Sequence, residues 1–240
     1  MSSLLLPDHI DESWKTFLTP DKLIMLNEIE HKLTDNINPD RKNILRFLKV
    51  NLTGIKVVIL GQDPYPQQGM ATGRAFEVGG LCSWNQSFRQ VSLKNILRLL
   101  YKNHRQITLY KDIYSFSRVQ HEISKGEFPV FPPDKLFESW EKQGVLLLNT
   151  SFTCNSGDPG SHEHIWFEFS KQLISYISSF SKMHWFLWGK HACGKRSFID
   201  SGILYISRHP MMCSEKYEDD FLKSDCFLNT GHLIQWLGQT

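Results

Sequence analysis

The sequence lacks the marks of several specialised classes of protein. Its five cysteines are scattered and odd in number, and no two are spaced C-x-x-C. This excludes zinc-ribbon and iron–sulfur spacing and indicates a reducing compartment. No stretch approaches the roughly 18 apolar residues of a membrane span, and the first residues do not have the pattern of a signal peptide. We therefore expect a soluble protein without metal or cofactor, cytoplasmic in a bacterial or viral-host setting, with a nuclear location left open.

Excess charge is also lacking. The chain has 27 Lys+Arg against 25 Asp+Glu, a net charge of only +2. A strongly basic DNA-coating protein is excluded, whereas a local basic patch is not. Aromatic residues are plentiful instead, with 16 Phe, 7 Tyr and 7 Trp among 240 residues. This number is enough for a large core, with some aromatic side chains left for a binding surface.

Four short apolar runs predict buried parallel strands at residues 55–60, 145–148, 184–188 and 203–207. Helical spacing predicts helices at 93–100, with Ser92 as N-cap, at 166–180, at about 11–48, and a last one ending near Leu237. We expect one α/β domain over residues 1–240, with a helical region at 1–50 and an α/β core at 51–240. Its centre would be a four-stranded parallel sheet flanked by helices on both faces.

Polar residues follow the predicted strands. The carboxylate of Asp63, the amide of Asn149 and the imidazole of His209 each come shortly after one, with the aromatic rings of Tyr65 and Phe76. Ligands of parallel sheets bind beyond the carboxyl ends of the strands, so these groups should meet at one edge. No Ser or Cys nucleophile motif, glycine-rich phosphate loop or metal-ligand spacing is present. Hydrolysis at a base or sugar, without a metal or a covalent nucleophile, fits this set of groups best.

The segments 61–65 (GQDPY), 143–150 (QGVLLLNT) and 209–210 (HP) resemble motifs of family 1 uracil-DNA glycosylases. They occur in the family's order, and the resemblance covers roughly residues 50–238. It implies that the protein hydrolyses the N-glycosidic bond of uracil that has been flipped out of DNA. The product would be an abasic site for base excision repair.

The resemblance also implies a role for each residue at the strand ends. Asp63 would position the attacking water, and His209 would donate a hydrogen bond to uracil O2 as a neutral imidazole. Phe76 would stack on the base, Asn149 would pair with the edge that distinguishes uracil from cytosine, and Tyr65 would exclude the 5-methyl group of thymine. The backbone of Gln62 would help to hold the base. The resemblance also implies a set of residues that contact DNA: Ser92, Gly189, Lys190, Pro210, Met211, Met212, Cys213 and Ser214.

The chain departs from the family pattern at the surfaces that should contact DNA. Pro66 replaces the usual histidine after Tyr65, as in poxviral members, and residues 79–88 stand where a proline-rich loop is usual. Cys213 falls where a leucine normally wedges into the base stack, and Met211 or Met212 could take over that role. We therefore expect a greater preference for single-stranded substrate than is usual in the family.

A second interpretation stays open at this point. The altered loops also suit a DNA-binding or replication-processivity scaffold with weak or lost glycosylase activity, and Trp84 and Phe88 could contact a partner or belong to the core. The segment 162–164 (HEH) could suggest a metal, but we expect Ser161 to cap a helix and these residues to be solvated. Expected partners of a monomer are single- and double-stranded uracil DNA. The resemblance also allows an inhibitor protein that mimics DNA.

Overall fold

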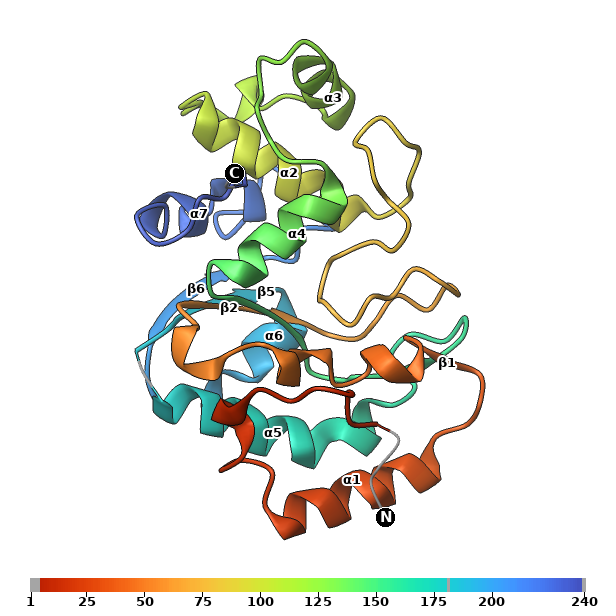
Figure 1. The fold of residues 1–240 in the computed structure, drawn as a ribbon. Coiled ribbons are helices and arrows are strands. Elements are labelled where there is room, and N and C mark those ends of the chain that lie inside the picture. Colours follow the sequence, from red (N-terminus) through yellow and green to blue (C-terminus); the bar gives the residue numbers. More distant parts are fainter. Residues whose placement is uncertain (1–4, 181, 239–240) are drawn as a thin grey trace.

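The computed structural model describes residues 5–180 and 182–238 (Figure 1). Its central sheet has four parallel strands in the order β3-β2-β5-β6. The strands are β2 (Val57–Gly61), β3 (Val145–Asn149), β5 (His184–Trp188) and β6 (Ile203–Ser207). All four predicted strands are therefore present, and the predicted parallel sheet is confirmed. The expectation that all four are buried was wrong for β6, an edge strand on which Ile203 and Ile206 are exposed.

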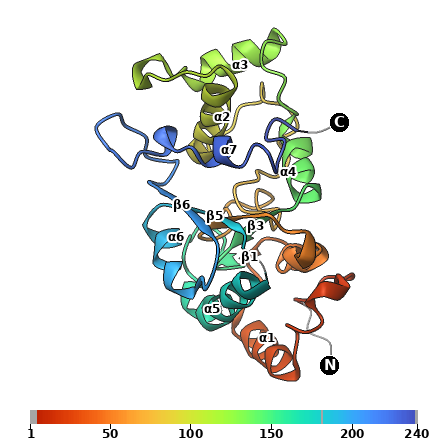
Figure 2. The same cartoon turned by 90° about the vertical axis from the view of Figure 1, so that its left-hand side faces the viewer.

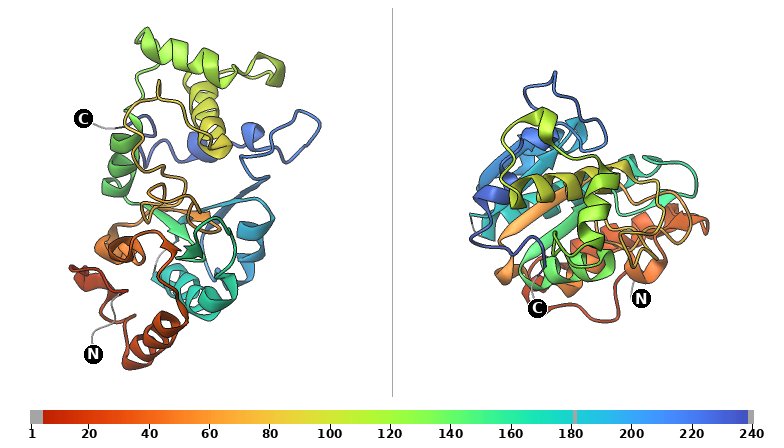
Figure 3. Two further views of the ribbon diagram at one scale, coloured as in Figure 1. Left: turned by 90° about the vertical axis from the view of Figure 1, so that its right-hand side faces the viewer. Right: turned by 90° about the horizontal axis from the view of Figure 1, so that it is seen from above.

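Helices cover both faces of this sheet (Figure 1, Figure 2 and Figure 3). On one side lie α2 (Val91–His104), α3 (Phe116–Ser124), α4 (Pro133–Lys142) and α7 (Cys226–Asn229). On the other lie α1 (Pro20–Lys32), α5 (Glu163–Phe180) and α6 (Lys190–Gly194). Short 3-10 helices span Glu12–Trp14, Arg41–Asn43, Arg46–Lys49, Leu52–Gly54, Tyr110–Asp112, Arg196–Phe198 and Phe221–Lys223. The result is a single α/β domain.

Each strand serves two cores because successive side chains point to opposite faces of a sheet. In β2, Val57 and Ile59 belong to the core beneath α2 and α4, whereas Val58 and Leu60 belong to the core beneath α1 and α5. All five residues of β2 are buried. Burial on both faces is the reason for the continuous apolar runs in the sequence.

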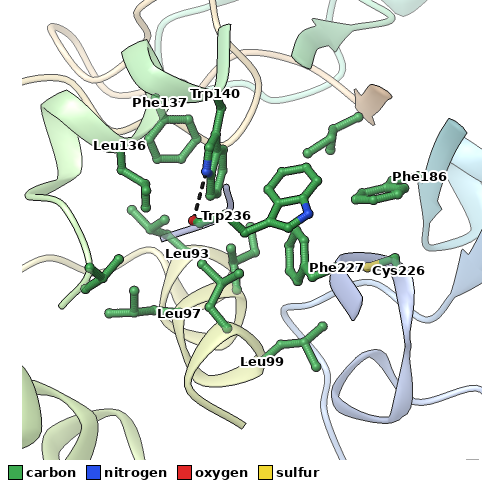
Figure 4. Packing of buried hydrophobic residues seen from close by; sticks show 14 of the residues in the cluster. Leu93, Leu97, Leu99, Leu136, Phe137, Trp140, Phe186, Cys226, Phe227 and Trp236 are labelled. Atoms are coloured by element: carbon green, nitrogen blue, oxygen red, sulfur yellow. Dashed lines mark hydrogen bonds between the residues drawn. The ribbon is translucent and has the colours of Figure 1, made fainter. Parts of the chain in front are cut away.

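Aromatic residues fill the first of these cores (Figure 4). Trp140 of α4 packs edge-on against Trp236, and its Nε1 donates a hydrogen bond to the Trp236 carbonyl at 3.0 Å. Trp84 is also buried, and its Nε1 donates to the carbonyl of Phe131 at 2.7 Å. Trp84 is therefore a core residue, and the surface role considered for it is excluded.

The helical prediction for residues 11–48 was only partly right. One α-helix, α1, begins at a proline in its first turn and ends at Lys32. It is followed by the two-residue strand β1 (Ile37–Asn38), which pairs with β4 (Cys154–Asn155). Pro39, next to β1, cannot donate a hydrogen bond to a continuing helix.

The helices predicted at 93–100 and 166–180 are confirmed by α2 and α5, but two details were wrong and two helices were missed. The last helix ends at Asn229 instead of near Leu237, because Thr230 bonds the Cys226 carbonyl through Oγ1 and turns follow. Helix α2 begins at Val91 after Gln90, so that Ser92 lies in its first turn and is not the N-cap. Helices α3 and α4 were not predicted. No helix of the described residues is long and apolar enough to cross a membrane.

Candidate active site

A cavity of about 320 Å³ opens where β2, β3 and β6 end. Its walls include eight of the predicted site residues: Gln62, Asp63, Tyr65, Phe76, Ser92, Asn149, His209 and Met211. In the sheet, β3 lies on one side of β2 and β5 lies on its other side, so the connections along the chain change direction at β2. The cavity lies beside this point, where the strand order reverses. This is the usual ligand position in open parallel sheets.

Asn149, the last residue of β3, is 6% exposed. Its side-chain amide bonds no other residue of the described chain, so its donors and acceptor remain available to a ligand in the cavity. Gly61 lies opposite in the sheet, and a Cβ at that position would lie 2.2 Å from Asn149 Oδ1. Only glycine at residue 61 leaves room for this amide.

The peptide between β2 and Asp63 is held by the carbonyl of Gln62. This oxygen accepts hydrogen bonds from Ser151 N at 2.8 Å, from Thr150 N at 3.2 Å and from Thr150 Oγ1 at 3.2 Å. The hydroxyl of Thr150 is in turn 2.7 Å from His191 Nε2. Three donors thus fix the Gln62 peptide, and His191 holds the hydroxyl of one of them.

Asp63 extends from this fixed peptide toward the loop after β4. Its Oδ2 accepts a hydrogen bond from the backbone N–H of Gly160 at 2.5 Å. Burial raises the pKa of Asp63, the negative charge of Glu163 adds to the rise, and the Gly160 hydrogen bond opposes it. No described residue donates to Oδ1, which leaves this oxygen able to accept from a water molecule.

His209 follows β6 and has its tautomer set by its own loop. The backbone N–H of Met211 donates to His209 Nδ1 at 3.2 Å. Burial lowers the pKa of His209, which favours the neutral ring. A neutral ring that accepts at Nδ1 carries its hydrogen on Nε2, so His209 is a hydrogen-bond donor. Gly189, with φ of 89°, permits the close approach of this residue, since a Cβ there would lie 2.7 Å from His209 Cβ.

Two aromatic side chains complete the cavity. Phe76 has φ of 66°, which is rare for a residue with a bulky side chain and costs conformational energy. Its ring lies 6.1 Å from that of His209 and 5.4 Å from that of Trp188. The hydroxyl of Tyr65 donates to the Phe76 carbonyl at 3.3 Å, and burial raises the pKa of Tyr65. The two rings form a flat, apolar slot beside polar groups.

Comparison with known proteins identifies the family. The chain is 34% identical over 236 residues to a protein of Buchnera aphidicola subsp. Cinara cedri that is named uracil-DNA glycosylase, covering 93% of this chain and 90% of that one. The chain belongs to the uracil-DNA glycosylase family. The member from Borrelia turicatae is 30% identical over 240 residues, with 95% and 92% covered. No family model matches the chain.

Solved structures of the family share the fold. The uracil-DNA glycosylase (UNG) of Nitratifractor salsuginis superposes with a TM-score of 0.70 at 21% identity and covers 96% of this chain and 93% of that one. The mimivirus uracil-DNA glycosylase gives 0.63 at 24% identity, covering 88% and 71%. The resemblance and the α/β architecture inferred from the sequence are therefore confirmed.

Compared with the family pattern described above, this member has a distinct loop after β6. Met211 and Met212 are 57% and 61% exposed. Cys213 is half-buried against the core, and its thiol lies 3.5 Å from the Pro210 carbonyl. The backbone N–H of Ser214 is tied to Asp220 at 2.6 Å. The two methionines therefore project from this loop, whereas the thiol of Cys213 does not.

The remaining residues predicted to contact DNA lie on different elements and differ in exposure. Ser92 lies in the first turn of α2 and lines the cavity, and Lys190 is exposed at the start of α6. Gly189 and Pro210 are buried, and Pro210 has its carbonyl bonded by Asn95 Nδ2. Of these four residues, only Ser92 lines the cavity.

A partly buried ion cluster that includes Arg74, two residues before Phe76, was missed from the sequence. Arg74 donates to Glu141 of α4 at 2.7 and 2.8 Å and to Glu77 at 2.9 Å. Burial works against ionisation of Glu141, but Arg74 and then Arg46 outweigh it and hold its pKa below the usual value. Arg74 and Glu141 are 67 residues apart, and nothing in their local sequence indicates the pairing.

The N-terminal region contributes to the site as well, which the sequence did not indicate. Asn38 Nδ2 donates to the carbonyl of Pro66 and to Ser156 Oγ, both at 3.0 Å. Gly157 N donates to the same Pro66 carbonyl at 2.9 Å. These bonds join the segment after Asp63 to the loop that carries Gly160. The turn residues of 155–160 were the available signal for that loop.

The expectation for residues 161–164 was wrong in part. Ser161 Oγ accepts from Asn155 N and donates to the Asp158 carbonyl, and it caps no helix. His162 is buried, with Nδ1 at 2.9 Å from Thr153 Oγ1, and is therefore not solvated. Among the described residues, no group of three or more His, Cys, Asp or Glu side chains is arranged to hold a metal ion.

Proposed function

We propose that this family member removes uracil from DNA by hydrolysing its N-glycosidic bond in the 320 Å³ cavity, which leaves an abasic site for base excision repair. One observation carries the proposal. The unpartnered amide of Asn149, the Nε2 donor of His209 and the open carboxylate oxygen of Asp63 line a single cavity.

The walls fit a uracil base that has been flipped out of the DNA. Phe76 offers its ring for stacking, and Asn149 can donate to O4 and accept from N3–H. Cytosine presents the opposite pattern at this edge and would leave the amide unpaired. Tyr65, held by its bond to the Phe76 carbonyl, fills the space that a 5-methyl group needs. The cavity thus favours uracil over both normal pyrimidines of DNA.

The reaction breaks the bond between C1′ and N1. The leaving base takes the electron pair, and its charge develops on O2, where His209 Nε2–H donates a hydrogen bond. Asp63 stabilises the positive sugar and orients a water molecule, whose oxygen bonds to C1′ and whose proton ends on the released base. No lysine lines the described cavity, so no amine is present to cleave the strand afterwards.

The DNA strand is held around the cavity mouth. We assign Ser92, Gly189, Lys190 and the loop 210–214 to this contact. Met211 and Met212 take the place of the wedge, because they project whereas Cys213 is half-buried. Lys190 would contact a phosphate as a point charge, which makes binding sensitive to salt.

Single- and double-stranded uracil DNA are the proposed substrates of a monomeric, cytoplasmic enzyme. The five cysteines are all free thiols, which supports a reducing compartment. A mimivirus UNG variant has been solved in complex with UGI, and an inhibitor protein that mimics DNA would cover the same edge of the sheet here. No observation favours the alternative of a scaffold without activity.

The proposal is tested by incubating the protein with uracil-containing DNA and counting alkali-labile breaks. Wild type should cleave, and Asp63→Asn and His209→Ala should each be slower by about 100-fold or more, because positioned acid–base groups contribute on that order. His232→Ala, a change of an exposed histidine at the opposite end of β5, is the control. A wild-type protein no faster than the two site variants would contradict the proposal.

A further inference from the structure

A second cavity of about 610 Å³ adjoins the first and is roughly twice as large. The two have four residues in common: Tyr65, Pro66, Ser92 and Met211. The second cavity, which we call the flanking groove, is therefore within reach of the nucleotide next to a uracil in the first. The roles proposed above leave this groove without a ligand.

The flanking groove is built by the segment that replaces the family's proline-rich loop. Its apolar lining comes from Met70, Val78, Leu81 and Phe88, and polar side chains surround it: Gln67, Gln86, Ser87, Arg89, Gln90 and Ser92. An apolar floor with a polar rim suits a nucleobase, which has flat apolar faces and polar edges. Aromatic platforms of this kind bind bases of single strands with little dependence on sequence.

Phe88 and Tyr65 are the aromatic residues of this lining, and Tyr65 is shared with the first cavity. The ring of Phe88 is fixed by residues that do not line the groove. Phe116 packs against it edge-on, with ring centroids 5.3 Å apart. The ammonium of Lys94 lies 5.1 Å from the centroid of the Phe88 ring. Such contacts hold the ring in place before a ligand arrives, which lowers the entropy cost of binding.

Two positively charged side chains beside the groove are suited to bind the negatively charged phosphodiester of DNA. Arg89 lines the groove and is exposed, and Lys94 lies next to Phe88. Neither cation forms an ion pair with a carboxylate of the described residues. Both are therefore available to a phosphate, although the chain as a whole carries a net charge of only +2.

We infer that the flanking groove binds the nucleotide next to the target uracil in the same strand, with its base on Phe88 and its phosphate near Lys94 and Arg89. The inference rests on the proposed function, because the uracil in the first cavity brings the neighbour to the groove. A neighbour that stacks on Phe88 has left its own base pair. This contact is open to a single strand and costs a duplex an additional broken pair.

The experiment compares three single-stranded oligonucleotides that each contain one uracil. One has a base on both sides of it, one lacks the base on the 5′ side, and one lacks the base on the 3′ side. Loss of the base on one of the two sides should lower kcat/KM of wild type about tenfold, the size of one base–aromatic stacking contact. Phe88→Ala should lose this sensitivity, and Phe88→Tyr should retain it.

Phe180→Ala removes a phenylalanine at the end of α5, on the opposite edge of the sheet, and should behave as wild type. Equal kcat/KM of wild type on all three oligonucleotides would overturn the flanking groove while leaving uracil excision intact. So would a Phe88→Ala variant that keeps the tenfold loss. Absence of excision from every oligonucleotide would overturn the proposed function and the groove with it.

Discussion

The amide of Asn149 fits at the end of β3 because residue 61 is glycine. A Cβ at residue 61 would meet Asn149 Oδ1 at 2.2 Å and Ala75 Cβ at 2.9 Å. Gly61→Ala should therefore displace the amide by a fraction of an ångström to one ångström. Because misplacement on that scale can cost about 100-fold in rate, we expect kcat/KM for uracil excision to fall by roughly that factor.

The control for this change is Gly194→Ala at the end of α6, where a Cβ would meet nothing within 4 Å. That variant should excise uracil at the wild-type rate. The two variants are compared by initial rates on the same single-stranded substrate, after circular dichroism has established that both are folded. Full activity of Gly61→Ala would mean that the Asn149 amide does not hold the base.

The two methionines after His209 differ in their surroundings. Met211 lines both cavities, whereas Met212 lines neither of them and is 61% exposed. Met212→Ala should slow excision from duplex DNA by about tenfold and leave single-stranded DNA within twofold, because only a duplex needs an emptied stack to be filled. Met211→Ala should slow both. Equal losses on both substrates for Met212→Ala would exclude it as the wedge.

At the scale of elements, the strands were the most predictable part. The runs that became β2, β3 and β5 are mostly apolar because two cores bury them. The polar residues just beyond the strand ends meet at one edge because the strands are parallel. The helices between residues 105 and 142 were not predicted, since α3 and α4 are short and mix aromatic with charged residues. Local periodicity carries too little information for such elements.

The supports behind the site were missed for a different reason. Arg74 with Glu141, and Asn38 with Pro66, are contacts between segments far apart in sequence. Their residue types are ordinary on a solvated surface, so the sequence does not distinguish a buried partner from an exposed one. The same holds for Gly160, which donates a hydrogen bond to Asp63 through its backbone N–H and has no side chain that could indicate this contact.

The junction of α4 with the Phe76 segment gives a prediction at this scale. Glu141→Gln would leave the buried guanidinium of Arg74 with Glu77 as its remaining carboxylate. Breaking a buried pair costs about 3–5 kcal/mol. Because Glu141 is partly exposed, we expect a smaller loss of about 2 kcal/mol in urea unfolding. Excision should also show a higher KM, because Arg74 is two residues from the strained Phe76.

Glu138→Gln on the same helix is the matched control. Its partners Lys135 and Lys142 are exposed, and exposed pairs contribute little. We expect its unfolding free energy to stay within about 0.5 kcal/mol of wild type and its KM to be unchanged. Equal effects of the two substitutions would show that the buried cluster has no special role.

At the scale of the whole molecule, histidines placed at the sheet and its connections link folding to pH. Burial lowers the pKa of His162, His184, His191 and His209 below the ordinary value of 6.5. The unfolded chain therefore binds protons at a higher pH than the folded protein does. The contribution of these histidines to stability is therefore present in full above about pH 6.5 and is lost as pH falls below that value and through their lower pKa values in the folded protein.

Thermal unfolding should accordingly show a lower Tm at pH 5.5 than at pH 7.5, before most carboxylates begin to titrate. The raised pKa of Asp63 acts in the opposite direction, but nearer the acid range of carboxyl groups. His162→Gln removes one buried imidazole and should reduce the dependence of Tm on pH. A Tm that is constant between pH 7.5 and 5.5 would show that these histidines titrate alike in the folded and unfolded chain. Circular dichroism at a series of pH values measures the difference directly.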